Sequence, residues 1–282
     1  MYFERISRLA ATYPIVEAAQ ARSGSSIMAT MTTLRERVLG GETTFGSWLS
    51  TGSPVVAEIA GQAGFDWLVI DAEHGMSAEA NVLGQLYAIG TTAATALVRI
   101  ERSDRLRISR ALDLGAGGLI VPRVDGADDV AQALTWMRFP PAGQRGVALG
   151  GRGQGFGRVG HAEIGTLNDV ALGVFQIENP SAVADSDAIA VLPGADVLFV
   201  GPADLSHALG VPGRFTDPTY LAAIDAVVAA CRAHGKAAGI LLYDPAAIGP
   251  HLERGFRFIG LGSDGGFVMS GAKAMLAAAG RL

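Results

Sequence analysis

The chain has 282 residues, of which 49% are apolar and 17% are charged, so it can fill a large core. Its net charge of −5, with no basic block, argues against nucleic acid or an anionic membrane as a partner. Cys231 is the only cysteine, which excludes an internal disulfide and zinc-finger spacing, and no apolar run is long enough to predict a membrane span. We expect a cytoplasmic protein.

Residues 1–40 do not share the pattern of the rest of the chain. They lack the apolar core of a secretory signal, and Glu4 and Glu17 argue against a transit peptide. We interpret 1–40 as an N-terminal extension, either an accessory arm or the result of a start site placed before Met28 or Met31. Residues 32–39 are expected to form a helix, and residues 41–282 to form a single domain.

From residue 44 onward, short apolar runs alternate with helical patterns, and glycines separate them. The runs predict strands at 44–49, 67–71, 94–99, 118–122, 171–178, 196–201, 237–242 and 258–262. Helical periodicity predicts helices at 55–63, 78–89, 104–114, 127–137, 182–192, 220–233, 246–254 and 267–279. Eight strand–helix units in succession favour a (β/α)₈ TIM barrel of the α/β class. A doubly wound open sheet is the alternative, but residues 50–53 make a poor phosphate loop after its first strand.

The stretch 67–75 ends a buried strand with Asp71, Glu73 and His74 within four residues. A purely structural interpretation is a turn in which Asp71 caps backbone amides and His74 is solvated. Three titratable groups at the tip of a buried parallel strand are costly unless they are used, and ligands bind at such tips. We therefore expect this stretch to belong to a binding or catalytic site.

The other predicted strands end in further polar or aromatic side chains. Glu178 and Asp204 form a carboxylate pair suited to Mg²⁺ or Mn²⁺ with waters and substrate oxygens. Arg99 can hold a carboxylate or enolate oxygen, since it stays charged at any pH. The remaining tip residues are Trp48, Gln176 and Ser263.

Two glycine-rich segments offer further interpretations. Residues 143–161 fall between the fourth and fifth strands, and we expect them on the active face as a lid or binding loop, unless they form only a flexible surface loop. Arg145, Arg152 and Arg158 in this loop could meet an anionic substrate. Residues 262–266 could bind phosphate, but Asp264 within them disfavours an anion.

Four segments together resemble the HpcH/HpaI aldolases, metal-dependent pyruvate aldolases of the phosphoenolpyruvate/pyruvate barrel superfamily. They are residues 63–75 (AGFDWLVIDAEHG), 138–147 (RFPPAGQRGV), 176–178 (QIE) and 199–206 (FVGPADLS). The resemblance covers residues 45–279. The front extension, the glycines of 150–154 and Tyr243 depart from the family pattern, which bears on the acceptor aldehyde.

The resemblance implies a role for each site residue. His74 would be the base, with Asp71 nearby and Asp113 as its orienting partner, and Arg99 would hold the enolate oxygen. The metal ligands would be Glu178 and Asp204, with Mg²⁺, Mn²⁺ or Co²⁺ as the cofactor. The remaining substrate contacts would come from Trp48, Gln176, Gly201 and the backbone amides of Ala203 and Asp204.

We therefore expect a class II aldolase that cleaves 4-hydroxy-2-oxo acids to an aldehyde and pyruvate, or a close 2-oxo acid such as hydroxypyruvate. Lys236 and Lys273 are the only lysines, and neither is expected at the site, so we expect neither a Schiff base nor a nucleotide cofactor. The alternative is a lyase of acyl-CoA thioesters or a decarboxylase of oxaloacetate-like acids. A barrel that only binds a keto acid would not need His74. The family also implies a homohexamer in which the last helix packs on a neighbouring subunit.

Overall fold

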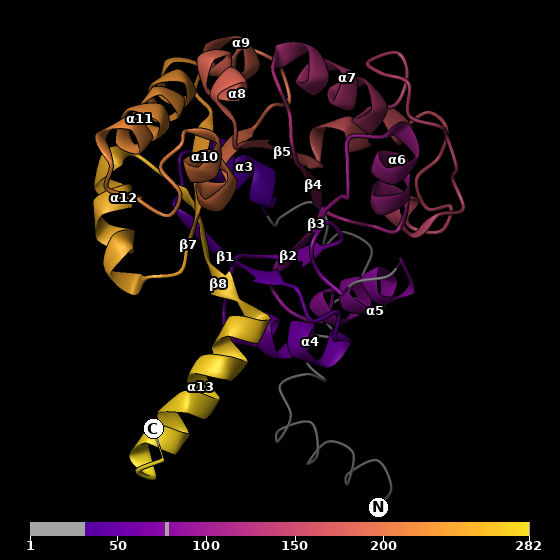
Figure 1. Ribbon diagram of the computed structural model, residues 1–282. Coiled ribbons are helices and arrows are strands. Elements are labelled where there is room, and N and C mark those ends of the chain that lie inside the picture. The colour runs from indigo at the N-terminus through magenta and orange to yellow at the C-terminus, as the bar shows by residue number, and fades with distance from the viewer. Residues whose placement is uncertain (1–31, 77–78, 282) are drawn as a thin grey trace, which may run out of the picture. The chain divides into compact units, whose positions relative to one another are not determined.

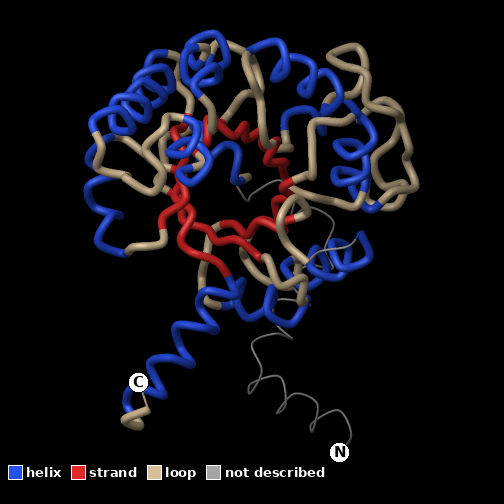
Figure 2. Tube along the Cα trace, viewed as in Figure 1, coloured by secondary structure: helices blue, strands red, loops and turns tan. Residues whose placement is uncertain are grey.

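The computed structural model describes residues 32–76 and 79–281, and residues 34–282 form one compact unit. Eight parallel strands form a closed barrel in chain order, and β1 pairs with β8. Figure 2 shows the strands as an inner ring enclosed by helices. The strands are β1(Thr44–Leu49), β2(Trp67–Asp71), β3(Thr95–Arg99), β4(Gly118–Val121), β5(Leu172–Ile177), β6(Val197–Val200), β7(Ala237–Leu242) and β8(Phe258–Ser263). The predicted (β/α)₈ barrel is therefore confirmed, and the open sheet is excluded.

The helices lie between the strands, close to their predicted positions. They are α3(Leu34–Leu39), α4(Pro54–Gln62), α5(Glu79–Ile89), α6(Arg105–Asp113), α7(Ala127–Met137), α8(Pro180–Ala184), α9(Ser186–Ala190), α10(Pro202–Ala208), α11(Pro218–Ala233), α12(Ile248–Arg254) and α13(Asp264–Ala278). The single helix predicted at 182–192 is divided at Asp185, whose carboxylate accepts the Ala127 amide at 2.5 Å. The short α10 was not predicted.

The barrel interior is filled by aromatic side chains that lie opposite glycines. The rings of Trp67 and Phe258 stack at 4.0 Å. A Cβ at Gly239 would lie 2.5 Å from the Phe199 ring, and one at Gly46 would overlap the Trp67 ring. Because interiors are close-packed, glycine on one strand allows the large ring on its neighbour to fit.

Helix α3 closes the N-terminal end of the barrel. Leu34 and Val38 pack in the same cluster as the interior aromatics, and Arg35 makes a two-point ion pair with the buried Asp196. Residues 34–40 thus belong to the compact unit, although the sequence placed the domain boundary at residue 40. The rest of the predicted extension, residues 1–31, lies outside the described residues.

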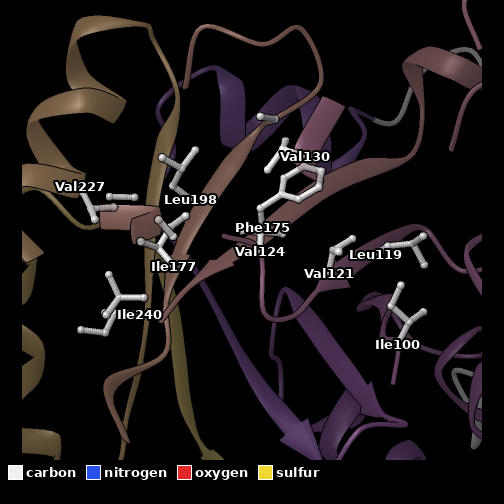
Figure 3. Packing of buried hydrophobic residues seen from close by; sticks show 14 of the residues in the cluster. Ile100, Leu119, Val121, Val124, Val130, Phe175, Ile177, Leu198, Val227 and Ile240 are labelled. Carbon is white, nitrogen blue, oxygen red and sulfur yellow. The ribbon is translucent and has the colours of Figure 1, made fainter. Parts of the chain in front are cut away.

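A second apolar layer lies between the strands and the surrounding helices. Phe175 and Leu198 point outward from β5 and β6, toward Val130 of α7 and Val227 of α11 (Figure 3). Each strand is therefore covered by the interior cluster on one face and by this layer on the other, which explains why the strands are nearly continuous apolar runs.

The last helix, α13, extends away from the barrel (Figure 1). Several of its apolar side chains are exposed, and Met275 is 74% accessible. Among the described helices, none combines the length and apolar character needed to cross a membrane.

The glycine-rich segment 143–161 lies at the opposite end of the barrel from the one predicted. It follows α7 and leads into β5, so it is a helix-to-strand connection on the side where strands begin. Strand tips and the connections that follow them occupy the other end. Arg145 accordingly binds Asp113, and Arg152 donates to the carbonyl of Leu114 and lies over the ring of Tyr87. The lid interpretation was therefore wrong for this protomer.

Candidate active site

The tip of β2 presents Asp71 as an acceptor for both backbone and side-chain donors. Its Oδ1 accepts the amides of Glu73 and His74 at 3.1 Å each, which fixes the turn after the strand. Arg99, at the tip of neighbouring β3, donates to both carboxylate oxygens at 3.0 and 2.7 Å. Burial alone would lower the pKa of Arg99, but the Asp71, Glu73 and Glu178 carboxylates outweigh it, and the pKa is raised. Arg99 is therefore a permanent cation at this site.

Glu73 connects three side chains at the strand-tip end of the barrel, which we call the mouth. Its Oε2 lies 3.2 Å from Arg99 Nη1, and its Oε1 lies 3.2 Å from Arg123 Nε and 3.8 Å from His74 Nε2. The His74 ring is 57% exposed, whereas Glu73 is nearly buried. Glu73, rather than Asp71, is thus the carboxylate nearest to the imidazole.

Glu178 lies where β5 ends, between two donors. Its Oε1 accepts the backbone N–H of Arg123 at 2.9 Å, and its Oε2 accepts Gln176 Nε2 at 3.0 Å. Burial raises its pKa to about 7, and the charges of Asp204 and Glu73 act in the same direction against the Arg123 amide and Arg99. Burial therefore makes the charge on Glu178 costly, and a bound cation would offset that cost.

This arrangement fits a divalent cation. Glu178 and the exposed Asp204 could supply hard oxygen ligands, and the buried Gln176 Oε1 has no hydrogen-bond partner within the described residues. Across residues 32–76 and 79–281, no group of three or more histidine, cysteine, aspartate or glutamate side chains could hold an ion. Two carboxylates completed by waters and substrate oxygens are typical of an open Mg²⁺ or Mn²⁺ site, not of a closed protein cage.

The other predicted substrate contacts come from β1 and from the start of α10. Trp48 is buried on β1, and its indole Nε1 has no partner within the described residues. Gly201 precedes the first turn of α10, where the amides of Ala203 and Asp204 have no acceptor inside the helix. These donors could receive the carboxylate of a 2-oxo acid.

Asp113 does not lie with these residues in the same protomer. It ends α6, at the end of the barrel where β4 begins, and its Oδ1 accepts Arg145 Nη2 at 2.7 Å and Gln154 Nε2 at 3.0 Å. It makes no hydrogen bond to His74 within this chain. Its predicted role as the orienting partner of His74 is therefore wrong within one protomer, because a helix after β3 carries its last residue away from the strand tips.

Asp264 occupies the loop that was the alternative phosphate site. Its carboxylate accepts the amides of Ser50, Thr51 and Gly265 at 2.8 to 3.1 Å, together with the hydroxyls of Ser50 and Thr51. Burial acts to raise the pKa of Asp264, but these hydrogen bonds outweigh it and lower the pKa. An internal anion thus takes the donors that phosphate would need.

Two mouth residues were not assigned roles from the sequence. Arg123 follows β4. Its backbone amide donates to Glu178 and its side chain donates to Glu73, and it reaches both because its φ is positive. Tyr243 follows β7 and is 73% exposed. Partial burial raises its pKa, with opposing effects from the charges of Arg99 and Asp71, so its phenol lies within their electrostatic range. The only feature of the sequence that pointed to Tyr243 was its departure from the family pattern.

A parallel barrel whose strand tips gather two carboxylates, a permanent cation and an exposed histidine has the layout of an enzyme for small oxyanionic substrates. Residues 44–271 match the family model described as HpcH/HpaI aldolase/citrate lyase, and the chain belongs to this family. It is an enzyme of the lyase class, and its relatives identify it as a class II pyruvate aldolase.

The comparisons with individual proteins cover most of each chain. A hydroxypyruvate/pyruvate aldolase of Agrobacterium fabrum is 39% identical, over 79% of this chain and 84% of the relative. A 2-keto-3-deoxy-L-rhamnonate aldolase of Klebsiella pneumoniae is also 39% identical, over 80% and 85%. The crystal structure of an HpcH/HpaI aldolase/citrate lyase family protein from Burkholderia cenocepacia superposes with a TM-score of 0.84 at 36% identity, covering 87% of this chain and 98% of the other.

Proposed function

We propose that this site cleaves 4-hydroxy-2-oxo acids reversibly into pyruvate, or hydroxypyruvate, and an aldehyde. The observation that carries the proposal is the meeting of Arg99 and Glu178 with His74 and Glu73 at the tips of β2, β3 and β5. Relatives named as a hydroxypyruvate/pyruvate aldolase and a 2-keto-3-deoxy-L-rhamnonate aldolase support this choice of substrates.

Substrate binding would use the carboxylate pair and the donors beside it. Glu178 and Asp204 would hold a divalent cation, which supplies Lewis acidity toward the 2-oxo acid head when bound. The first-turn amides of Ala203 and Asp204 would receive the substrate carboxylate, and Gln176 would contact its oxygens. Trp48 and Gly201 would supply the remaining substrate contacts.

Bond cleavage would use His74 and Arg99. His74 takes the proton from the C4 hydroxyl, the C4 oxygen becomes the aldehyde carbonyl, and the electron pair of the broken C3–C4 bond forms the pyruvate enolate. Arg99 donates to the enolate oxygen, and protonation of C3 completes pyruvate. Glu73 Oε1 lies 3.8 Å from His74 Nε2 and is the carboxylate oxygen nearest to this base.

The assay runs in both directions. In synthesis, a panel of aldehydes is supplied with pyruvate or hydroxypyruvate and a divalent metal, and the 4-hydroxy-2-oxo acid products are identified by mass spectrometry. In cleavage, the purified products are returned to the enzyme and pyruvate release is followed. Failure to form any adduct from either 2-oxo acid, with folded protein and saturating metal, would refute the proposal.

A further inference from the structure

Arg123 adopts a backbone conformation that is uncommon outside glycine. Its φ is +54°, and the adjacent strand β4 ends at Val121. This conformation aims its amide at Glu178 Oε1, 2.9 Å away, and sends its side chain across the tip of β3 to Glu73. Strained backbone of this kind persists where the surroundings hold it, often at functional sites.

The Arg123 guanidinium keeps most of its hydrogen-bonding capacity. Nε donates to Glu73 Oε1 at 3.2 Å, but Nη1 and Nη2 make no hydrogen bond or ion pair with the described residues. The side chain is 70% exposed, and Glu73 divides its charge between Arg123 and the buried Arg99. The two free amino groups form a planar fork of the shape that binds a carboxylate or sulfonate at two points.

The depth of this fork decides which part of a substrate it meets. Glu178 and Gln176 are buried, whereas the Arg123 side chain opens to solvent beside them. A 2-oxo acid head bound at the carboxylate pair would therefore project its remaining carbon chain past Arg123. We propose that Arg123 selects acceptor aldehydes that carry an anionic group beyond the reacting carbonyl. This inference rests on the proposed aldol function.

The test compares two aldehydes, 4-oxobutanoate and its uncharged methyl ester, methyl 4-oxobutanoate, each added to pyruvate by the metal-loaded enzyme. The wild type should prefer the acid. Arg123→Met keeps an unbranched side chain at the strained backbone position and should lower kcat/KM for the acid by roughly 10- to 100-fold, the loss of one charge-assisted interaction. The ester should change by less than about 5-fold, as for an exposed charge. Arg123→Lys, which keeps the charge without the fork, should fall between.

The matched control is Arg102→Met. Arg102 is an exposed arginine in the loop after β3, at the same end of the barrel, and it has no hydrogen bond or ion pair to the described residues. If Arg123 binds the anion directly, the Arg102→Met substitution should leave the preference for the acid unchanged. A similar loss in Arg102→Met would mean that general electrostatic steering causes the preference, and would overturn the inference.

A second measurement separates selectivity from chemistry. Exchange of the pyruvate methyl protons in D₂O reports enolate formation with no aldehyde present, and it should persist in Arg123→Met. The inference would be overturned if Arg123→Met lost kcat/KM equally for the acid and the ester while proton exchange continued. It would also be overturned if the wild type exchanged protons but showed no preference for the acid. A wild type that neither exchanges these protons nor adds any aldehyde would overturn the proposed function itself, and the inference with it.

Discussion

Gly201 and Glu178 fit against each other at the ends of β6 and β5: a Cβ on Gly201 would lie 2.7 Å from the Glu178 Oε2 atom. The glycine has φ −89°, so alanine is acceptable to the backbone, and the obstacle is the Glu178 side chain, whose Cβ would also lie 3.2 Å away. The close approach therefore serves the position of Glu178, not the turn.

Gly201→Ala should displace the Glu178 carboxylate and weaken metal binding by about 10- to 100-fold, the range found when groups that orient metal ligands are altered. Mn²⁺ titration by calorimetry measures this directly. The control is Gly265→Ala, where the nearest atoms to an added Cβ lie 3.8 and 3.9 Å away and affinity should not change. Equal Mn²⁺ affinity in Gly201→Ala and the wild type would mean that Glu178 is not a ligand.

His74 and Arg99 should differ in their effects on two reactions that pass through the same enolate. Retro-aldol cleavage needs a base for the C4 hydroxyl, worth about 10²–10⁴ in rate, whereas decarboxylation of oxaloacetate does not. His74→Ala should therefore lose the aldol reaction and largely spare decarboxylation. Equal loss of both would show that His74 positions the metal or substrate.

Arg99→Ala should lower both activities, because each develops negative charge on the same oxygen, where one donor contributes roughly 10²–10³. Its removal also leaves Asp71 and Glu73 without their main cation, so circular dichroism and metal affinity accompany the rate measurements. Loss of the aldol reaction alone would place Arg99 away from the enolate.

Turnover should depend on a divalent metal and not on an imine. Lys236 precedes β7, at the end of the barrel opposite the site, and donates to the Leu192 carbonyl at 3.0 Å, while Lys273 lies in α13. A chelator should abolish turnover, and Mg²⁺, Mn²⁺ or Co²⁺ should restore it. Borohydride trapping of a pyruvate adduct on either lysine would contradict this assignment.

Helix α13 should pack on another subunit, because Val268, Met275 and Leu276 leave an apolar surface exposed on it. Light scattering should give a mass well above the 29.0 kDa of one chain, consistent with the hexamer that the family resemblance implies. Replacing Val268 and Met275 with glutamate should reduce that mass. A wild type that stays monomeric at micromolar concentration would exclude this packing.

Asp264→Asn should destabilise the connection between β1 and β8, because an amide cannot accept all the hydrogen bonds that the carboxylate receives from Ser50, Thr51 and Gly265. We expect a loss of about 2–4 kcal/mol in the free energy of unfolding, measured by urea titration. Since folding lowers the pKa of Asp264, its contribution is complete above the unfolded value, about 3.9, and disappears as the pH falls through the folded value. The difference between variant and wild type should thus narrow in acid.

Sequence patterning located the strands well because each is buried on both faces and appears as a continuous apolar run, as in 67–71. It also located His74, Arg99 and Glu178 at strand tips, since strand direction alone decides which end of a barrel they share. It failed at the segment 143–161, where the side of the barrel was assigned without following the intervening helix, and the family resemblance placed Asp113 beside His74 although α6 ends at the opposite side of the barrel. The hydrogen bond from the Ala127 amide to Asp185, where the predicted helix 182–192 is divided, left no periodic signal.

The part played by Arg123 could not be predicted for a different reason. Its contacts with Glu73 and Glu178 depend on a positive φ, which a sequence indicates for glycine or asparagine but not for arginine. Glu73 was seen beside His74, but its bridging position needs the tips of three strands in place.

Leu34 and Val38 pack against the aromatic side chains that fill the barrel interior, so we expect substrate to reach Glu178 from the strand tips. With the 2-oxo acid seated deepest, against Glu178, the aldehyde must depart before pyruvate can. Cleavage should then follow an ordered release in which pyruvate competes with the substrate for free enzyme. The aldehyde should instead inhibit noncompetitively, by capturing the enolate before it escapes.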